Sequence, residues 1–239
     1  MRKKGLLARA FTMTVVCASI ASLGVAPCAI AATPAQDRAT AQAINLASKD
    51  LPGWLQSPAT NNSSDQRLSK ELSACVGAPN PSTADAAHIS SPYFDNGNAS
   101  VSSDVTMMRT RGAGQADLAA MRRPKMVRCL DKLALPYFKA QFPTGTTISA
   151  FRVDPLRPSW LPTNGYGYRL SMVVSSKPKG PGATLRIGIV ADGIRFLSGR
   201  AEVELSVTQG LSGVPSAALE QRLTSTLVAR AEREAHRTS

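Results

Sequence analysis

Histidines and paired carboxylates are the residues of this chain whose spacing first suggests chemistry. Asp85 and His88 stand three residues apart, so the carboxylate could orient the imidazole as a general base. Glu202 and Glu204 are two residues apart and share one face of any β-strand, where paired carboxylates could do acid–base work. The second histidine, His236, lies three residues from the C-terminus.

A nucleophilic hydrolase needs a serine or cysteine, a base and an orienting group. The chain has no G-x-S-x-G motif, and we expect His88 to lie in a loop. An exposed strand face explains Glu202 and Glu204 better than acid–base work does. We therefore expect no catalytic residue and no enzymatic activity. A secreted hydrolase stays the third hypothesis, which a carboxylate or His88 meeting a serine in a cleft would favour.

Other classes of site find little support in the residues. Two cysteines and two distant histidines beyond residue 31 do not make a zinc site, so we expect no metal and no cofactor. The basic, glycine-rich segment 177–182 lacks the spacing of a phosphate-binding loop and indicates a hairpin loop. Among the aromatic residues of the strand that begins at Tyr166, only Arg169 is basic, and it faces the other way. We expect no nucleic-acid partner.

The first 31 residues predict a secretory signal peptide. Four basic residues precede an uncharged run over 10–26, and Ala29-Ile30-Ala31 offers small residues for cleavage after Ala31. Pro27 before Cys28 argues against lipid attachment, whereas an uncleaved N-terminal membrane anchor facing outward stays an alternative. We expect a secreted or envelope-associated domain over 32–239, with 32–37 as a flexible leader and no stable membrane span after cleavage.

The net charge of +12 falls to +8 without the leader, because the leader holds four of the 28 basic residues and none of the 16 acids. A basic exported protein could contact anionic lipid or cell-wall polymer, although solubility alone also explains the charge. Four basic residues lie around the start of one predicted helix: Arg122, Arg123, Lys125 and Arg128. They are candidates for contact with an anionic polymer or lipid headgroup, and the simpler hypothesis is a solvated helix end.

Cys75 and Cys129 are the two cysteines that remain in the exported domain, and an oxidising compartment favours a disulfide between them. Each lies on the apolar stripe of a predicted helix, where a structural cystine is expected. Leu68, Leu72 and Val76 share the stripe with Cys75, and Met126, Leu130 and Leu133 share the other with Cys129.

Apolar periodicity predicts an α+β fold: an antiparallel sheet of about five strands with flanking helices, in a single domain. Helices are expected over 38–49, 65–76, 115–121, 124–136 and 216–235, and strands over 100–110, 146–153, 166–174, 185–191 and 194–207. Residues 77–99 indicate a long surface connection with at most a short strand near Tyr93. Asp192-Gly193 indicates a tight turn, Gly199 a bulge or a crossing helix, and Pro136 a helix end or bend.

Aromatic surface concentrates around a proline-rich loop and the start of one strand. Trp160, Tyr166, Tyr168 and Met172 are the candidate ligand-binding residues, because aromatic faces suit glycan or lipid ligands; core packing is the alternative for the two tyrosines.

The layout resembles a known group of exported domains. Four features follow one another along the chain: Asp50-Leu51-Pro52-Gly53-Trp54 after a helix, Cys75 near a helix end, Val101-Ser102-Ser103-Asp104-Val105 in a strand, and Arg128-Cys129-Leu130. This order is similar to that of actinobacterial exported domains related to the extracellular sensor domain of mycobacterial serine/threonine kinase H and to small mycobacterial lipoproteins. The resemblance implies a central antiparallel sheet, flanking helices, a ligand-sized cleft and a non-catalytic sensing role. Unlike that sensor domain, this chain offers one disulfide and no kinase domain.

The leading hypothesis is therefore an exported binding or sensing domain that captures a lipid, a cell-wall glycan or an envelope protein outside the cell. A structural or interaction protein without a small ligand is the second hypothesis.

Overall fold

The computed structural model describes residues 32–59, 63–176, 184–210 and 213–237. Within these ranges eight antiparallel strands form one sheet in the order β1-β3-β4-β8-β7-β6-β5, and β2 pairs with β4. The strands are β1 (Leu55–Ser57), β2 (Asp85–Ser90), β3 (Tyr93–Asp95), β4 (Ala99–Met108), β5 (Thr146–Leu156), β6 (Gly165–Ser176), β7 (Leu185–Ser198) and β8 (Ala201–Gly210). The predicted signal peptide and the 177–182 loop lie outside the described residues.

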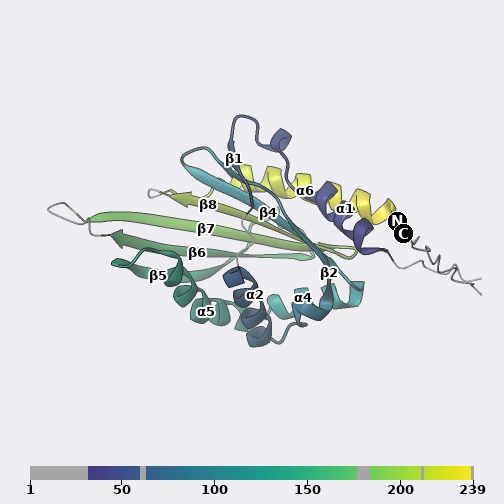
Figure 1. Cartoon of the computed structure of the whole chain (residues 1–239), viewed down its shortest axis with the longest axis horizontal. Helices are drawn as coiled ribbons and strands as arrows, with labels where there is room; N and C mark the ends of the chain where they lie inside the picture. The colour runs from purple at the N-terminus through teal and green to yellow at the C-terminus, as the bar shows by residue number, and fades with distance from the viewer. Residues whose placement is uncertain (1–31, 60–62, 177–183, 211–212, 238–239) are drawn as a thin grey trace, which may run out of the picture. The chain divides into compact units, whose positions relative to one another are not determined.

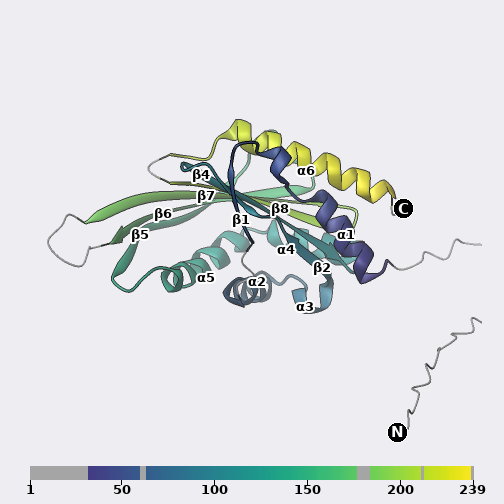
Figure 2. The ribbon, with the colours of Figure 1, turned by 45° about the horizontal axis from the view of Figure 1, so that its top comes forward.

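Helices cover both faces of the sheet (Figures 1 and 2). One face carries α1 (Pro34–Ile44) and α6 (Ala217–Arg237), and the other carries α2 (Ser63–Val76), α4 (Arg111–Met121) and α5 (Lys125–Gln141); η1 (Ser48–Asp50) and α3 (Pro81–Ala84) are single turns. The predicted α+β class with an antiparallel sheet is confirmed, and the expectation of about five strands was too low.

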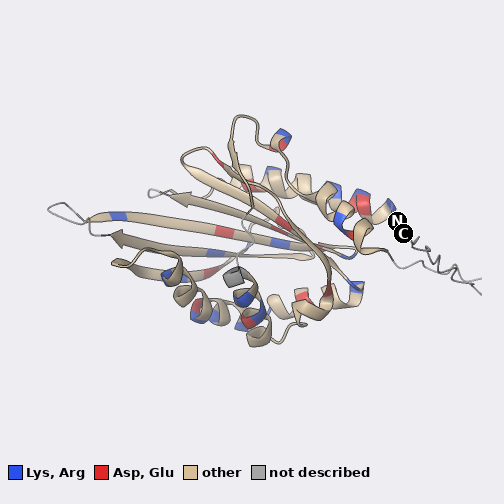
Figure 3. Cartoon of the chain, in the orientation of Figure 1, with Lys and Arg blue, Asp and Glu red and all other residues tan. Residues whose placement is uncertain are grey.

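The central strands β4 and β8 separate apolar from polar side chains by alternation. Val101 and Val105 of β4 and Val203 and Leu205 of β8 are at most 1% exposed and pack with α1 and α6. The intervening polar side chains point to the opposite face, and Figure 3 shows acidic and basic positions in the middle of strands as well as on helices. The sheet therefore has one apolar face, and its other face is polar at the centre.

On the second face, α5 packs over β5 and β6 and holds α2 beside it. Met126, Leu130 and Ala134 of α5 are buried against Leu170 and Met172 of β6. Cys75 of α2 and Cys129 of α5 form a disulfide with Cα atoms 5.9 Å apart, which confirms the predicted pairing. The covalent link fixes the C-terminal end of α2 against α5.

The expectation of a surface connection over 77–99 was wrong where this segment forms α3 and β2, whereas the short strand allowed near Tyr93 is β3. β2 alternates between Ala87 and Ile89, which pack on the α1 side, and His88 and Ser90, which face the other way. Alanine, aspartate and serine have low strand propensity, so pairing with β4 decides the conformation. β1 was missed for a different reason: its three residues are all exposed.

Asp192-Gly193 is not a turn but the middle of the 14-residue strand β7. Asp192 pairs across the sheet with Arg169 through two hydrogen bonds of 2.7 and 2.6 Å, and Gly193 lies opposite Tyr168. A Cβ atom at Gly193 would stand 2.4 Å from that ring, so glycine makes room for the aromatic side chain. The hairpin turn is instead at Gly199, whose φ of +59° suits a two-residue β-turn between Ser198 and Ala201.

Two helix boundaries also differ from expectation. The predicted flexible leader 32–37 is largely the first turn of α1, because Thr33 caps the helix in a capping box with Gln36. Asp37 is buried there against Arg200. Pro136 lies inside α5, which continues to Gln141, so this proline does not end the helix.

Candidate functional site

A cavity of about 750 Å³ lies between the polar centre of the sheet and the helices α2, α4 and α5. Its lining comes from widely separated parts of the chain, so only the folded sheet assembles it. The residues that line its sheet side include Asp85, His88, Ser90, Tyr93, Ser102, Asp104, Thr106, Met108, Tyr168, Arg195, Glu202 and Glu204, and those from the helices include Leu68, Leu72, Asp117, Met121, Leu130 and Tyr137.

The floor of the cavity follows from the two-residue period of β4 and β8. Asp104 pairs with Glu204 and Thr106 with Glu202 across these antiparallel strands, so their side chains share one face. The sequence correctly placed Glu202 and Glu204 on a common face. The expectation that this face is exposed was wrong, because Glu202 is only 7% exposed beneath the helices.

Arg195 of β7 is the cationic centre of the floor. Its guanidinium donates to Glu202 Oε1 at 2.8 Å and to Glu204 Oε2, and it lies 5.9 Å from the centroid of the Tyr166 ring. Tyr168 donates its hydroxyl to Glu204 Oε1 at 3.0 Å. Burial works against the charge of Arg195, but Glu204 and its neighbours outweigh it and raise the pKa of this guanidinium.

Two carboxyl groups of the cavity hold their protons more tightly than usual. Burial raises the pKa of Glu202 to about 8; Arg195 opposes this effect, and the neighbouring carboxylate of Asp117 adds to it. Burial also raises the pKa of Asp85 to about 6. Asp117 is 7% exposed, and among the described residues its Oδ2 atom has no hydrogen-bond partner.

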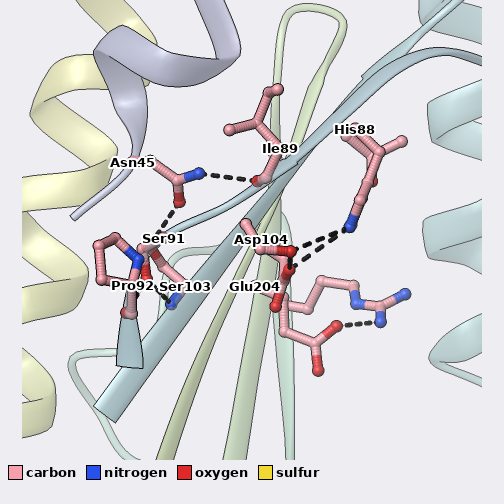
Figure 4. A network of polar contacts seen from close by, with 11 residues as sticks. Asn45, His88, Ile89, Ser91, Pro92, Ser103, Asp104 and Glu204 are labelled. Atoms are coloured by element: carbon pink, nitrogen blue, oxygen red, sulfur yellow. Dashed lines mark hydrogen bonds and ion pairs between the residues drawn. The ribbon is translucent and has the colours of Figure 1, made fainter. Parts of the chain in front are cut away.

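His88 and Asp104 face each other at the edge of the floor (Figure 4). His88 Nε2 is 3.4 Å from Asp104 Oδ1 and 3.4 Å from Ser90 Oγ, while its Nδ1 is 3.0 Å from Thr106 Oγ1. Ser90 donates its hydroxyl to Asp104. The hydrogen bond with Asp104 raises the pKa of His88. Burial opposes ionisation of Asp104, but hydrogen bonds from His88 and Ser90 hold its pKa below the usual value.

A buried network behind the strands positions β2 and thus His88 and Ser90. Asn45, which caps α1, donates to Ile89 O at 2.7 Å and accepts from Ser103 Oγ at 2.5 Å (Figure 4). Ser91 Oγ accepts the Ser103 backbone N–H at 2.8 Å. These bonds hold β2 against β4 from the α1 side, so the strand keeps its polar residues toward the cavity.

Apolar side chains form the opposite wall. Leu72 of α2, Met121 of α4 and Leu130 of α5 are at most 8% exposed, and all three line the cavity. The disulfide between α2 and α5 fixes two of these three helices together. The cavity thus combines a charged floor with an apolar roof, as sites for small organic ligands commonly do.

The four predicted ligand-binding residues do not come together. Tyr168 lines the cavity, whereas Tyr166 is buried beside Arg195 and does not line it. Met172 is 4% exposed in the core under α5, and Trp160 packs against the core on the α1 and α6 side. Sequence analysis considered Asp85, Glu202 and Glu204 but did not assign them to a site, and it missed Asp104, Asp117 and Arg195 as site residues.

The predicted anionic-contact cluster spans the turn between α4 and α5 and the first turn of α5. Arg122 is engaged with the fold, because its guanidinium donates to Gly165 O at 2.8 and 3.2 Å. Arg123, Lys125 and Arg128 are exposed. None of the four lines the cavity. Their contact with an anionic partner stays a prediction.

In the described part of the chain, no three histidine, cysteine or carboxylate side chains converge as metal ligands would. No described helix is long and apolar enough to cross a membrane. The disulfide fits an oxidising compartment. No protein-family model matches this chain, and no curated protein sequence matches it.

Proposed function

We propose that the exported domain is a non-enzymatic binding module that captures a small organic ligand in the cavity over β4 and β8. The observation that supports this most strongly is the cavity itself, with about 750 Å³ between buried charges and an apolar roof. This volume lies in the range of natural ligand sites. A protein that only needed a stable core would gain nothing from burying Glu202, whose charge opposes burial.

The resemblance to kinase sensor domains suggests that capture serves sensing. Under this proposal the domain is exported by its N-terminal signal, and the disulfide forms outside the cytoplasm. A lipid and a cell-wall glycan fragment each have polar and apolar parts, so either would suit a cavity with a charged floor and an apolar roof. The alternative of an interaction protein without a small ligand predicts that the cavity holds only water.

A thermal-melt screen of small organic molecules tests the proposal. Ser102→Phe places a ring from the floor into the cavity, and Thr208→Phe is the matched control, because Thr208 lies on the same face of the sheet outside the cavity. Ligands should raise the melting temperature of the wild type and of the control, and not that of Ser102→Phe. Equal stabilisation of all three proteins, or of none, would argue against a ligand in this cavity.

A hydrolase is the second candidate, because His88, Ser90 and Asp104 do converge in a cleft. In a catalytic triad the nucleophile and the carboxylate bind opposite ring nitrogens. Here Ser90 and Asp104 both approach Nε2, and Ser90 donates to Asp104 instead of to the imidazole, so the geometry favours a binding floor. A fluorophosphonate, which labels activated serines, should leave Ser90 unmodified; stoichiometric labelling of Ser90 would establish the hydrolase.

A further inference from the structure

The charge inside the cavity is opposite to the charge of the chain. Five carboxylates line the cavity (Asp85, Asp104, Asp117, Glu202 and Glu204), against the basic residues Lys70 and Arg195. With every acid ionised, five minus two leaves a formal charge of −3, and with the proton that Glu202 retains near neutral pH the charge is −2, whereas the whole chain carries a formal net charge of +12. Because carboxylates that are packed together repel one another, this concentration of acids costs stability unless a positive group compensates it.

The cations present in the cavity do not compensate all five carboxylates. Arg195 is shared between Glu202 and Glu204, and His88 engages Asp104. Lys70 lies on the exposed side of α2. That leaves Asp117 and Asp85 without a basic side chain in hydrogen-bond contact among the described residues.

Asp117 provides an independent sign of a missing donor. It is 7% exposed, it lines the cavity, and its Oδ2 has no hydrogen-bond partner among the described residues. A buried carboxylate oxygen without a donor is destabilising, so such groups usually have a partner in the functional state. The carboxyl group of Glu202, which retains its proton near neutral pH, makes a hydrogen bond with Asp117 but brings no positive charge. The Oδ2 atom is therefore open to a donor from a ligand, and a cationic donor would also offset the acids around it.

We propose that the ligand of the cavity is an organic cation: an ammonium or guanidinium group that binds Asp117 and its neighbouring carboxylates, attached to an apolar body that packs under α2 and α5. This inference rests on the proposed function and specifies the ligand class. The apolar body follows from Leu72, Met121 and Leu130, which form the wall opposite the acids. The aromatic ring of Tyr137 lines the same cavity and adds a surface that attracts cations.

A matched series of probes separates charge from shape: 4-phenylbutylamine, 4-phenylbutanol and 4-phenylbutyrate, titrated by calorimetry at neutral pH. The amine should bind about tenfold or more tighter than the alcohol, which corresponds to about 1.4 kcal/mol, and the carboxylate should bind weakest. Asp117→Asn should reduce the affinity for the amine about tenfold and leave the affinity for the alcohol unchanged. Asp131→Asn, an exposed acid on α5 outside the cavity, should change neither affinity.

A second readout is proton release. Glu202 faces Asp117 from α4, Arg195 from β7 and Glu204 on its own strand, and it retains a proton near neutral pH. An arriving ammonium group favours the ionised carboxyl, so amine binding should release protons. Calorimetry in buffers of different ionisation enthalpy measures this release, which Glu202→Gln should abolish.

The outcomes are distinguishable. If the alcohol or the carboxylate binds as tightly as the amine, and Ser102→Phe abolishes binding, then the ligand class is wrong while the binding function stands. If the amine binds Ser102→Phe as well as it binds the wild type, then the cavity is not the site, and both proposals fail. If none of the three probes binds at millimolar concentration, the cation inference is overturned. If Asp117→Asn does not fold, Asp85→Asn replaces it with the same expected loss, because Asp85 lines the same cavity beside Asp117 and also has no basic side chain in hydrogen-bond contact among the described residues.

Discussion

Removing the disulfide should cost a large share of the stability of the domain, because the link closes a long loop. Cys75 and Cys129 are 54 residues apart in the chain. For a loop of that length the chain-entropy relation gives about 4 kcal/mol at 25 °C. A domain of this size has about 5–15 kcal/mol in total. The reduced protein should therefore still fold, although with a small remaining free energy of unfolding.

Urea unfolding of the same polypeptide with and without reductant isolates the link, because nothing else in the sequence changes. Tryptophan fluorescence reports the transition through Trp54 and Trp160, which both pack against the core. With a urea dependence of about 2 kcal/mol per molar, the midpoint should fall by about 2 M on reduction. The double variant Cys75→Ala with Cys129→Ala should reproduce the value of the reduced protein.

The loss should be concentrated at the roof of the cavity. Leu72 and Val76 hold α2 to the core formed with α5, and α2 otherwise has few buried residues. Amide hydrogen exchange should therefore accelerate in α2 more than in the central strands after reduction. A stability change below about 1 kcal/mol, or uniform acceleration across the sheet, would refute the argument that the disulfide mainly restrains α2.

Three further predictions concern buried groups. The pKa of Glu202 is raised from 4.5 to about 8 in the folded state, so the stability that this group contributes should be lost as the pH rises between these values. Thermal melts across this window should show a falling melting temperature, and Glu202→Gln should make the fall smaller. The same dependence of melting temperature on pH in the variant would contradict the raised pKa. Arg230 donates to the Asp50 carboxylate at 2.6 and 2.9 Å and to Asn45 O. Arg230→Ala should therefore lower the free energy of unfolding, measured by denaturant titration, by about 3 kcal/mol. An unchanged free energy of unfolding would exclude a structural role for these bonds. Gly193→Ala should cost about 1–3 kcal/mol in the same assay because a tyrosine ring covers the glycine, whereas Gly210→Ala, with open space around it, should be close to neutral.

The sequence predicted an element correctly where apolar residues of its periodic pattern are buried in the core. The stripes of Leu72 and Leu130 correctly placed α2 and α5, and the symmetry of their cysteines predicted the disulfide. The alternation predicted β4 and the strand around Val203 and Leu205 because their apolar faces are buried, although the strand expected over 194–207 is divided by the turn at Gly199. These elements account for the fold class and for the apolar face of the sheet.

The site was not predictable because the same alternation has two explanations. Polar residues such as Asp104 and Glu204 indicate a solvent-facing strand surface, and the helices α2, α4 and α5 above them turn that surface into a cavity. β2 was missed because its residues have a weak preference for strand conformation, and its pairing with β4 decides the structure. The prediction of a turn at Asp192-Gly193 was wrong because this glycine makes room for the ring of Tyr168 on the neighbouring strand and does not reverse the chain. Each failure involves a tertiary contact across the sheet.

The central claim is that the cavity over β4 and β8 holds a ligand in the natural setting of the protein. Native mass spectrometry of the domain recovered from its host tests this directly, with Ser102→Phe prepared in parallel. The claim predicts an added mass on the wild type, released on denaturation and missing from the variant. The bare polypeptide mass for both proteins, or the same added mass on both, would contradict it.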